Sequence, residues 1–376
     1  MRILHINSER SWRGGENQVL LLSSLLARRG HQVTIVCPPD SELAKRAVSK
    51  SIAVEFLPMR GEIDLRAGYK LARLIEKGGY EIVHCHSSHA HSMALIASKL
   101  TRIPALIVSR RVDFPVGGKG WLNYYKYKSV DKIIAVSNGV KQVLTEGGIP
   151  EEKVVVIHSG IDIRRFEDIG CHRDLYEEFH LKGEEKVVGA VAALAAHKDY
   201  PNFLQAARIM ADRFPQVRFL IVGEGKEAGK LKKLSAELDL KRWVIFTGFR
   251  KDIPRLLSIF DVFVVSSYLE GLCTSILDAM VAGVPVVATQ AGGIPEVIKD
   301  GENGVLVPPR DPERLAGAVL RVLNDPELAH RLVETGYSRV REFSAERMAN
   351  KTEEVYRSVL KAKSGERSTY SSLSRM

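Results

Sequence analysis

The chain has 376 residues, of which 45% are apolar and 27% are charged, and this balance is typical of globular proteins. At about 150 residues per domain, the length predicts two or three domains. No apolar run approaches the roughly 18 residues needed to span a bilayer. The opening MRILHINSERSWRGGENQ is typical of a strand followed by a polar loop, not of a signal peptide. These features argue against secretion and against a membrane span.

Cysteine usage indicates a reducing compartment. The cysteines lie far apart and form no CxxC pair: Cys37, Cys85, Cys171 and Cys273. This pattern argues against a disulfide framework and against a cysteine-based zinc site. We therefore expect a cytoplasmic protein.

The positive charge is unevenly distributed. Lys and Arg number 55 against 45 Asp and Glu, a formal net charge of +10. Residues 1–165 hold 25 basic and 15 acidic residues, whereas residues 166–376 hold 30 of each. The whole excess therefore lies in the first half, which indicates an anionic partner there. Composition alone leaves nucleic acid, a membrane surface and an acidic substrate open.

The first half alternates strand and helix patterns. Helical periods are found over residues 16–30, where Gly30 provides a C-cap, and over 65–79. Short β-branched runs predict strands at 2–6, 32–38, 53–58, 81–87, 105–111, 132–137 and 153–158. This alternation predicts a parallel sheet covered by helices on both faces.

The alternation begins again after residue 185. Strands are predicted at 185–194, 217–223, 243–248, 262–267 and 284–290, and helices at 202–215, 229–240, 273–283 and 313–325. Residues 160–180 lack a clean period and are interpreted as the connection. We predict two Rossmann-like domains with a cleft between them, and place the chemistry in loops that follow strands. The expected divisions are 1–165, 166–362 with a last helix that is allowed to cross back, and a disordered tail over 363–376.

Two features of the first half could contact a ligand. Gly14 and Gly15 lie between the first strand and a helix, where glycine lets backbone amides approach an anion, although a flexible turn explains them equally. The spacing is not GxGxxG, which disfavours a nicotinamide dehydrogenase. Histidines cluster in HCHSSHAH: His84, His86, His89 and His91. No carboxylate completes a ligand set, so we favour structural or substrate-contacting histidines and expect no metal site.

Basic and aromatic residues are interleaved in the stretch SRRVDFPVGGKGWLNYYKYKSVDK, which begins at Ser109. Aromatic and basic side chains together suit a lipid interface or single-stranded nucleic acid. A packed helix with a solvated lysine face accounts for the stretch equally well. The candidate acceptor or membrane residues are Arg110, Lys119, Trp121 and Lys126.

The second half contains the most informative stretch, EGLCTSILDAMVAGVPVVATQAGGIPEVIKDGENGVLVPPRD, which begins at Glu270. Glu270 and Asp278 lie on either side of a strand-to-helix turn, where carboxylates can accept hydrogen bonds from sugar hydroxyls. Thr274 and Ser275 can present hydroxyls and amides to a phosphate at the helix N-terminus.

This stretch resembles the signature of retaining, nucleotide-sugar-dependent glycosyltransferases of family 4, which have the GT-B fold of two Rossmann-like domains facing across a cleft. The family pattern EGxGxPxxEAMAxGxPVVA is followed by GGxxEVVxDGxNGxLVPPxD. The match is long and nearly gapless, and the resemblance extends over most of the chain, but it is faint over 110–130.

The resemblance implies roles for individual residues. Glu270 matches the first Glu of the family's E-x7-E pair near the donor sugar, and Asp278 replaces the second, which usually holds the ribose. Lys198 matches the lysine that neutralises the donor diphosphate, whereas the usual Arg five residues earlier is Ala193. Further expected donor contacts are Arg250, the loop Gly223, Glu224 and Gly225, and the Gly14-Gly15 loop.

The first half departs from the family at one position. Arg111 stands where many members have a catalytic His. A guanidinium cannot act as a base, but it can stabilise charge on a leaving phosphate. His84 or His86 would then position the acceptor; alternatively, Arg110 or Arg111 contacts an anionic acceptor. The expected catalytic set is Glu270, Lys198, His86 and Arg111.

The sequence therefore predicts a retaining glycosyltransferase that needs a nucleotide-sugar donor as substrate, with no cofactor and no obligatory metal. We expect a lipid-linked or acidic glycan acceptor of the lipopolysaccharide or cell-envelope type, and a cytoplasmic protein that is peripheral on the inner face of the membrane. The alternatives are a GT-B sugar-nucleotide epimerase, which would need a second acid–base pair, and a nucleic-acid-binding protein, which gains nothing from the E-x7-D pair. We therefore expect no nucleic-acid partner.

Overall fold

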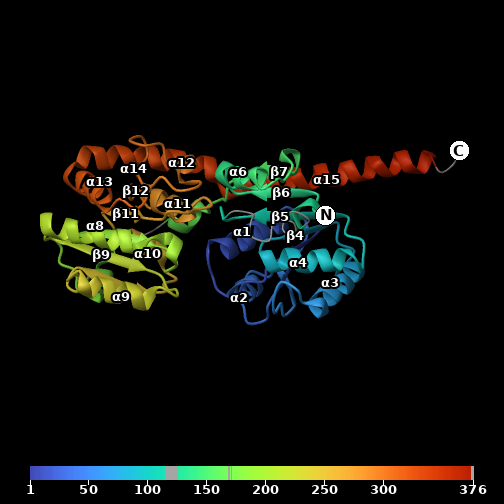
Figure 1. The fold of residues 1–376 in the computed structure, drawn as a ribbon, viewed down its shortest axis with the longest axis horizontal. Helices are drawn as coiled ribbons and strands as arrows, with labels where there is room; N and C mark the ends of the chain where they lie inside the picture. The colour runs from blue at the N-terminus through green and yellow to red at the C-terminus, as the bar shows by residue number, and fades with distance from the viewer. Residues whose placement is uncertain (115–125, 168–169, 171, 374–376) are drawn as a thin grey trace. The chain divides into compact units, whose positions relative to one another are not determined.

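The computed structural model describes residues 1–114, 126–167, 170 and 172–373. The chain divides into two compact units, which are Met1–Gly160 together with Ala345–Met376, and Ile161–Ser344. Each unit is built on one parallel sheet flanked by helices (Figure 1). The predicted α/β class is therefore confirmed, with the sheet as the framework of each unit.

The first unit contains a seven-stranded sheet in the order β3-β2-β1-β4-β5-β6-β7. Its strands are β1 (Arg2–Ile6), β2 (Gln32–Cys37), β3 (Ala53–Phe56), β4 (Ile82–Cys85), β5 (Ala105–Arg110), β6 (Lys132–Ala135) and β7 (Val154–Val156). Its α-helices include α1 (Gly14–Arg28), α2 (Glu42–Ser49), α3 (Leu65–Gly78), α4 (Ser88–Ser98), α6 (Asn138–Glu146) and α15 (Ala345–Leu373), and a short 3-10 turn, η1, spans Glu151–Lys153.

Local sequence explains how these helices begin and end. Ser87 caps α4 by accepting a hydrogen bond from the Ala90 amide, and Asp64 caps α3 in the same way from Ala67. Such caps satisfy backbone donors that a first helical turn leaves open. Gly79 ends α3 in the left-handed region with φ of 60°, where glycine costs least. Because α1, α2, α3, α4 and α6 each follow a strand of the sheet, their capped first turns lie toward the carboxyl edge of the sheet.

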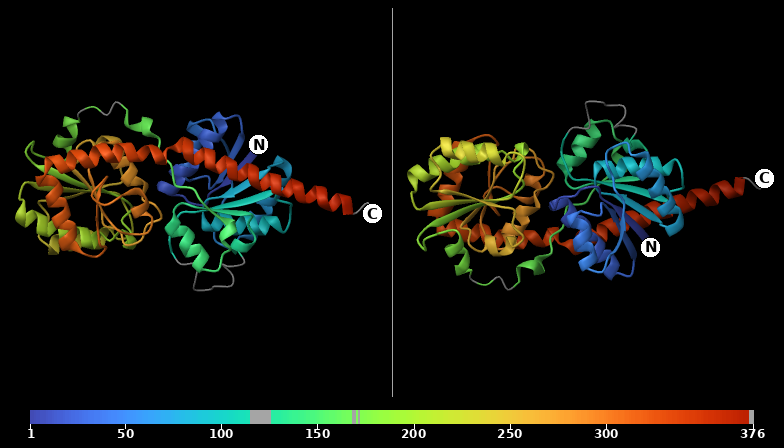
Figure 2. Two further views of the ribbon diagram at one scale, coloured as in Figure 1. Left: turned by 90° about the horizontal axis from the view of Figure 1, so that it is seen from above. Right: turned by 90° about the horizontal axis from the view of Figure 1, so that it is seen from below.

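The last helix completes the first unit. Met348, Ala349 and Tyr356 of α15 are buried against strand residues such as Ile3 and Ile107, and Figure 2 shows α15 running along this sheet. Residues 345–362 therefore belong with the first unit, which is the crossing back that the sequence analysis allows for the last helix. The boundary before the second unit also lies at Gly160 and not at residue 165. The apolar face of α15 packs on the first sheet, which makes this helix part of the first unit.

The second unit contains a six-stranded sheet in the order β10-β9-β8-β11-β12-β13. The strands are β8 (Lys186–Val191), β9 (Val217–Val222), β10 (Val244–Gly248), β11 (Val262–Val265), β12 (Val286–Thr289) and β13 (Val305–Val307). The α-helices include α7 (Arg173–Glu178), α8 (Tyr200–Arg213), α9 (Ala228–Glu237), α10 (Ile253–Leu257), α11 (Thr274–Val281), α12 (Ile294–Val297), α13 (Pro312–Asn324) and α14 (Pro326–Val340), with 3-10 turns η2 (Ile163–Phe166), η3 (Ala196–Lys198) and η4 (Arg341–Phe343).

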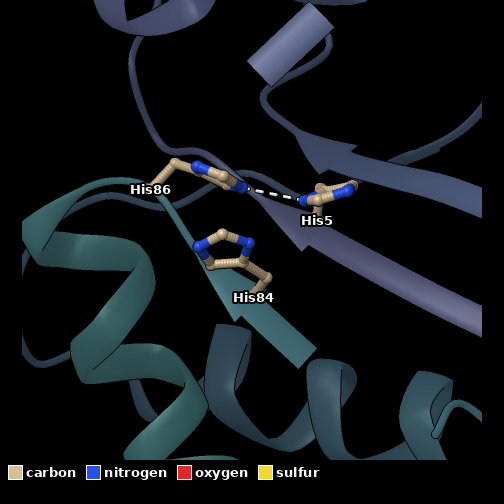
Figure 3. Close-up of side chains that lie close together, drawn as sticks. All are labelled: His5, His84 and His86. Carbon is tan, nitrogen blue, oxygen red and sulfur yellow. Dashed lines mark hydrogen bonds between the residues drawn. The ribbon is translucent and has the colours of Figure 1, made fainter. Parts of the chain in front are cut away.

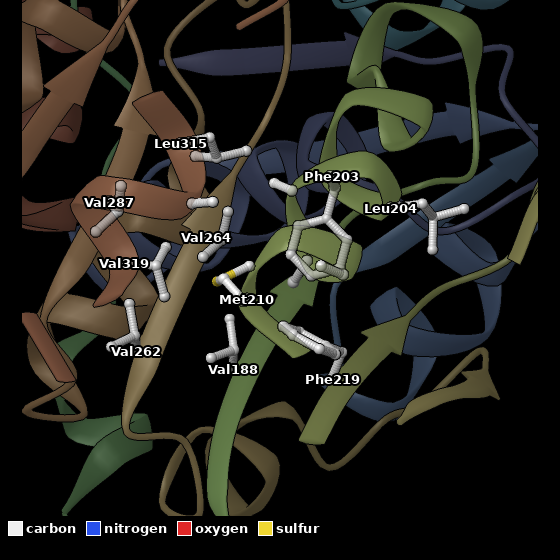
Figure 4. Packing of buried hydrophobic residues seen from close by; sticks show 14 of the residues in the cluster. Val188, Phe203, Leu204, Met210, Phe219, Val262, Val264, Val287, Leu315 and Val319 are labelled. Carbon is white, nitrogen blue, oxygen red and sulfur yellow. The ribbon is translucent and has the colours of Figure 1, made fainter. Parts of the chain in front are cut away.

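The core of the second unit lies between α8, the sheet and α13. Phe203 and Met210 of α8 are fully buried with Val264 of β11 and Val319 of α13, as Figure 4 shows. Burial of such side chains contributes about 1.5–3 kcal/mol each. This packing fixes the sheet from which the loops of the candidate site extend.

Two predicted boundaries differ from the structure. Strand β13 is not predicted, because three residues are too few to show a strand pattern. A disordered tail is predicted over 363–376, whereas α15 is helical to Leu373, and the helix formers Lys361, Ala362 and Lys363 favour this continuation. Residues 374–376 lie outside the described residues.

Two observations bear on the predicted location. In the part of the chain that the structure describes, no helix has the length and apolar character needed to cross a membrane. Cys37, Cys85 and Cys273 are free and buried, and Cys171 lies outside the described residues.

Candidate active site

A pocket in the second unit lies where β8 and β11 end. It is lined by the ends of these strands and by side chains from the following loops: Ala190, Val191, Ala192, Lys198, Tyr200, Val264, Val265, Ser266, Ser267, Glu270, Cys273 and Ser275. In parallel sheets, ligands bind beyond the carboxyl ends of the strands. The predicted residues Lys198, Glu270 and Ser275 therefore meet in one pocket, whereas Thr274 and Asp278 are not among its lining residues.

Lys198 and Glu270 form an ion pair in this pocket. The Glu270 side chain is 8% exposed and the Lys198 side chain 16%. Ser267 Oγ donates a hydrogen bond of 2.7 Å to Glu270 Oε1. A buried charge pair is costly to desolvate unless further hydrogen bonds satisfy it, and Ser267 provides such a bond. The pair therefore holds one cation and one carboxylate in place at the strand ends.

Backbone contacts fix the two loops that carry this pair. Ser266 Oγ donates to the Lys198 carbonyl at 2.8 Å, and the Tyr268 amide donates to the His197 carbonyl at 3.0 Å. The Gly293 amide donates to the Glu270 carbonyl at 3.0 Å. Because both loops are tied by their backbones, the ion pair is preorganised by the fold.

Helix α11 begins at the edge of the pocket. Its N-cap is Cys273, which has φ of 65°, and the family pattern EGxGxPxxEAMAxGxPVVA has glycine at this position. A non-glycine residue in the left-handed region costs roughly 1–2 kcal/mol. Cys273 Sγ lies 3.4 Å from Ser275 Oγ. Burial raises the pKa of the Cys273 thiol to about 12, so the pocket contains a neutral thiol beside the ion pair.

Asp278 lies one turn into α11 and is half-buried. Burial raises the pKa of its carboxyl from an ordinary 3.8 to about 6, and the positive charge of Arg165 opposes this rise. This carboxyl therefore changes charge close to neutral pH.

Glycines allow a close backbone approach beside the pocket strand β8. Gly223 has φ of 142°, and a Cβ there would lie 2.0 Å from the Ala192 carbonyl oxygen. A Cβ on Gly225 would lie 2.2 Å from the Leu194 carbonyl oxygen. The loop after β9 is thus held against the loop after β8, and the structure gives the predicted donor-loop glycine Gly223 a packing role.

Arg250 is occupied by carboxylates of its own unit. Its guanidinium pairs with Glu178 and binds Asp252 at 2.7 and 2.8 Å. These hydrogen bonds raise the pKa of the guanidinium above its usual value. The predicted donor contact of Arg250 would therefore have to compete with two anions.

One cation near the pocket is not predicted from the sequence. Arg310, after β13, lies with its Cζ 4.5 Å from the ring centre of Tyr268, and its charge acts on Asp199, the residue after Lys198. The family usually has an arginine five residues before Lys198, but this chain has the uncharged Ala193 at that position. Sequence reasoning missed Arg310 because it falls at a variable position of the LVPPRD motif.

In the first unit, three histidines lie together at the centre of the sheet (Figure 3). His5 of β1 is paired in register with His84 of β4, and His86 follows β4. His5 Nδ1 and His86 Nε2 share a hydrogen bond of 2.8 Å. Burial, together with the charge of Arg111, lowers the pKa of His5 to about 3 and that of the other two well below the usual value. All three imidazoles are therefore neutral at physiological pH.

The spacing of the three rings allows a metal ion, since their ligand atoms lie within 4.8 Å of one another. However, His84 already uses both ring nitrogens, with Tyr356 Oη at 2.6 Å and Ser109 Oγ at 2.8 Å. Metal-bound histidines normally use the second nitrogen for an outer partner, and a cation would also be repelled by Arg111. The residues therefore fit a hydrogen-bonded network better than a metal site.

Arg111 lies between this network and the start of α1. Its Nη1 donates to Ser159 Oγ at 3.2 Å, its buried Nε has no hydrogen-bond partner among the described residues, and its Cδ is 3.7 Å from the position of a Cβ on Gly15. Burial lowers the pKa of the guanidinium to about 10, so it stays charged at neutral pH. The predicted residues Gly15 and Arg111 are thus brought together at a helix N-terminus, which favours anions.

Glu16 shapes the same corner. Its carboxylate accepts hydrogen bonds from the Arg13 amide at 3.0 Å and from Asn7 Nδ2 at 3.2 Å, which fixes the first turn of α1 after Gly14. Burial raises the pKa of Glu16. Sequence reasoning missed Glu16, although it directly follows Gly15, and it missed His5, which only the pairing of β1 with β4 brings to this corner.

Arg110 and Lys126, both predicted to contact the acceptor or a membrane, are engaged within the unit. Arg110 donates to Tyr127 Oη at 2.7 Å and to the carbonyls of Val112 and Phe114. Lys126 Nζ donates to the Ser88 carbonyl at 2.9 Å. The Arg110 contacts tie the end of β5 to Tyr127, and the Lys126 contact holds that lysine at the start of α4. Lys119 and Trp121 lie outside the described residues.

Comparison with known proteins defines the class. Two parallel-sheet units of this kind have the GT-B fold, and the solved structure of HepE from Anabaena, in complex with UDP and glucose, superposes with a TM-score of 0.85 at 22% identity, covering 94% of this chain and 99% of that one. The family model Glycosyltransferase Family 4 matches residues 12–165, and Glycosyl transferases group 1 matches residues 173–339. The chain belongs to the family 4 glycosyltransferases.

Curated relatives are similar over most of their length. The putative glycosyltransferase EpsD of Bacillus subtilis is 28% identical, with 76% of this chain and 79% of that protein covered. A UDP-Gal:alpha-D-GlcNAc-diphosphoundecaprenol alpha-1,3-galactosyltransferase of Escherichia coli is 26% identical, with 87% and 89% covered. The protein is thus an enzyme that transfers sugars.

Proposed function

We propose that this enzyme transfers a sugar from a nucleotide-diphosphate donor to a lipid-linked or otherwise anionic glycan of the cell envelope, with retention at the anomeric carbon. The observation that carries the proposal is the Lys198–Glu270 pair, held by Ser267 in the pocket where β8 and β11 end. A fixed cation and carboxylate at this edge suit a ligand that has both a diphosphate and sugar hydroxyls.

The chemistry proposed for this pocket is charge neutralisation. The bond between the anomeric carbon and the diphosphate oxygen breaks, and a bond from the acceptor oxygen forms on the same face. The acceptor proton passes to the departing diphosphate, so the products are the glycoside and the nucleoside diphosphate. Lys198 and the amides at the start of α11 would stabilise the charge of the leaving group. The proposal needs no cofactor and no resident metal.

Roles for Glu270 and Asp278 follow from this proposal. Glu270 would turn from Lys198 toward the donor sugar hydroxyls once the diphosphate takes over the lysine. Asp278 would accept hydrogen bonds from the ribose hydroxyls when it is ionised, with Gly223 and Arg250 closer to the nucleotide. In this proposal the donor diphosphate takes the place of Glu270 as the partner of Lys198. Because the protein already holds both side chains away from water, binding needs less reorganisation of solvent than it would at a solvated site.

Charge supports an anionic acceptor on the first unit. This unit carries 30 Lys and Arg against 18 Asp and Glu, whereas the second carries 25 against 27. Arg111 beside Gly15 provides a buried cation for a phosphate or carboxylate, with His86 as a neutral group at the same sheet edge. The Escherichia coli relative is named for a diphosphoundecaprenol acceptor, which combines a lipid with a diphosphate. We therefore propose a protein that works at the inner face of a membrane.

A donor screen tests this function. UDP-, GDP- and ADP-sugars are incubated with the enzyme and a lipid-linked diphosphosugar, and free nucleoside diphosphate is measured, with nuclear magnetic resonance of the product to read the anomeric configuration. We expect one donor class to release nucleotide and to form a glycoside of the same configuration. Conversion of the donor to an epimer without glycoside would favour an epimerase and contradict the proposal.

A further inference from the structure

The segment after β3 exposes a group of large apolar side chains. Phe56 at the end of β3 is 55% exposed, Ile63 in the following loop 80%, and Leu65 and Tyr69 of α3 67% and 57%. Single exposed apolar residues are ordinary, but a run of them in one short segment marks an interaction site. The apolar side chains of this segment are therefore available to a partner.

Helix α3 adds a basic stripe beside them. Ala67, Leu71, Ala72 and Ile75 face the unit and are buried. The exposed basic residues recur at spacings of four, three and four residues, which places them on one side of the helix: Arg66, Lys70, Arg73 and Lys77. Leu65 and Tyr69 lie alongside this stripe. The outer face of α3 thus combines cations with apolar side chains.

Acidic residues of the same segment are engaged locally. Asp64 caps α3, Glu76 pairs with Arg73 at 3.5 Å, and Glu62 accepts a hydrogen bond from Ser88 Oγ at 3.1 Å. Exposed pairs such as Arg73–Glu76 are weak and leave the basic stripe able to attract anions.

The position of this face links it to the candidate site of the first unit. Because the sheet is parallel, the loop after β3 lies at the same edge as the loops after β1, β4 and β5, which hold Gly15, His86 and Arg111. The Glu62–Ser88 hydrogen bond ties this loop to the start of α4, two residues after His86. A partner that covers Ile63 and Leu65 therefore lies beside the edge of the site.

We propose that residues 56–77 form a docking surface for an anionic lipid bilayer, a role that rests on the proposed lipid-linked acceptor. Ile63, Leu65 and Tyr69 enter the boundary between headgroups and acyl chains, and the basic stripe contacts the headgroups. The net positive charge of the first unit directs this face toward the membrane. The lipid portion of the acceptor then stays in the bilayer while its sugar reaches the edge of the sheet.

Vesicle co-sedimentation tests the surface directly. The full chain is mixed at low ionic strength with vesicles of equal parts phosphatidylglycerol and phosphatidylcholine, or of phosphatidylcholine alone. We expect binding to the anionic vesicles, at least tenfold weaker binding for the Ile63→Glu/Leu65→Glu double variant, and about fivefold weaker binding for each basic residue removed in Arg66→Gln and Lys70→Gln. Leu65→Glu places a glutamate in the first turn of α3, where it suits the helix dipole. Ile63, Arg66 and Lys70 are exposed, so their replacement removes no buried contact.

Leu100→Glu is the matched control. Leu100 is 58% exposed in the same unit, but it precedes β5 and therefore lies at the opposite edge of the sheet. We expect this variant to bind vesicles as the wild type does. Equal loss of binding in the control, or no binding by the wild type, would overturn the proposal.

Two further readouts distinguish membrane docking from a loss of donor chemistry and from self-association. Release of nucleoside diphosphate from the free donor should be the same in the double variant and the wild type, so that failure of the proposed function and failure of the docking surface are distinguishable. If light scattering shows that the double variant abolishes a dimer while vesicle binding persists, the face binds a second copy of the chain and the membrane proposal is wrong.

Discussion

The two units use the same sheet plan for different chemistry. In each, the first strand lies next to the fourth: β1 beside β4, and β8 beside β11. The candidate site residues follow these two strands in both cases. In the first unit they are Gly15 and His86, and in the second Lys198 and Glu270. The adjacent strand pair is where the order of the sheet reverses, and this point leaves room for a ligand in any open parallel sheet.

The difference lies in how charge is held at that point. The second unit balances its cation with a neighbouring carboxylate, and the unit as a whole is nearly neutral. The first unit holds one buried cation, Arg111, beside neutral imidazoles and the carboxyl group of Glu16, and carries the excess of positive charge. The same sheet order therefore carries a preformed ion pair in the second unit and a buried cation in the first. The residues in the loops after the strands account for this difference.

Removal of the preformed pair should have the largest effect. For Lys198→Ala we expect kcat/KM to fall by about 10²–10³, because a charge that stabilises the leaving group is lost and Glu270 is left buried without its cation. Nucleotide-sugar affinity should also fall, as measured by calorimetry. Lys186→Ala is the control, because Lys186 forms an ion pair with Asp261 of the same unit at 2.9 Å. Unchanged affinity in Lys198→Ala would contradict the assigned role.

Removal of the buried cation of the first unit, Arg111, should have the next largest effect. We expect Arg111→Ala to lower turnover of the lipid-linked acceptor by about 10–100-fold and Arg111→Lys to restore only part of it, since lysine lacks the guanidinium fork. Because the pKa of Arg111 is about 10, its contribution should not change between pH 6 and pH 9. Arg102→Ala, an exposed change before β5, is the control. Full activity with Lys would show that charge alone suffices.

Asp278 should make the second unit sensitive to pH. Its carboxyl has a pKa of about 6 in the folded protein against an ordinary 3.8. Because the folded state then binds the proton more tightly, the free energy of unfolding contributed by this group falls as the pH rises from about 4 to 6. Donor affinity should rise about tenfold from pH 5 to pH 7 as the carboxylate forms. Asp278→Asn should remove both dependences, and a pH profile identical to wild type would exclude this assignment.

The smallest effect is expected at the N-cap of α11. Cys273→Gly relieves left-handed backbone strain of roughly 1–2 kcal/mol, which offsets the lost burial of the thiol. The free energy of unfolding should therefore change by less than about 1 kcal/mol. Cys85→Gly, in the fully buried strand β4, should cost about 2–3 kcal/mol, since no strain compensates for the cavity. Urea unfolding measures the free energy of unfolding of both variants. An equal loss of stability in the two variants would contradict this prediction.

Much of the fold follows from local patterns. The strands of the first sheet and most of the second are predicted, because β-branched runs between helical periods are a strong local signal. Strand β13 is too short to give one. Helix α15 belongs to the first unit because Tyr356 packs in the core of that unit. An amphipathic pattern predicts that one face of a helix is buried, but it does not predict which sheet covers that face.

The candidate site residues also divide into those that local sequence predicts and those that only the fold brings together. Lys198, Glu270 and Arg111 can be selected from motifs, but the partners that define their electrostatics cannot. His5 stands in an ordinary strand sequence, and only the pairing of β1 with β4 brings it to His86. Arg310 reaches Tyr268 only because β13 ends at the same sheet edge. A motif identifies candidate residues from the local sequence. The charges and hydrogen bonds around those residues depend on contacts between segments far apart in the chain.

The dependence of the first unit on α15 sets an order for folding during synthesis. Residues 161–344 form one continuous stretch, whereas the first unit is complete only when Tyr356 has been synthesised and can form its hydrogen bond with His84 Nδ1. Until then, the apolar strand face that α15 covers is open to chaperones. A chain stopped near residue 344 would therefore contain all of the second unit but would leave the imidazole network without its tyrosine. Completion of the enzyme is thus linked to translation of its last helix.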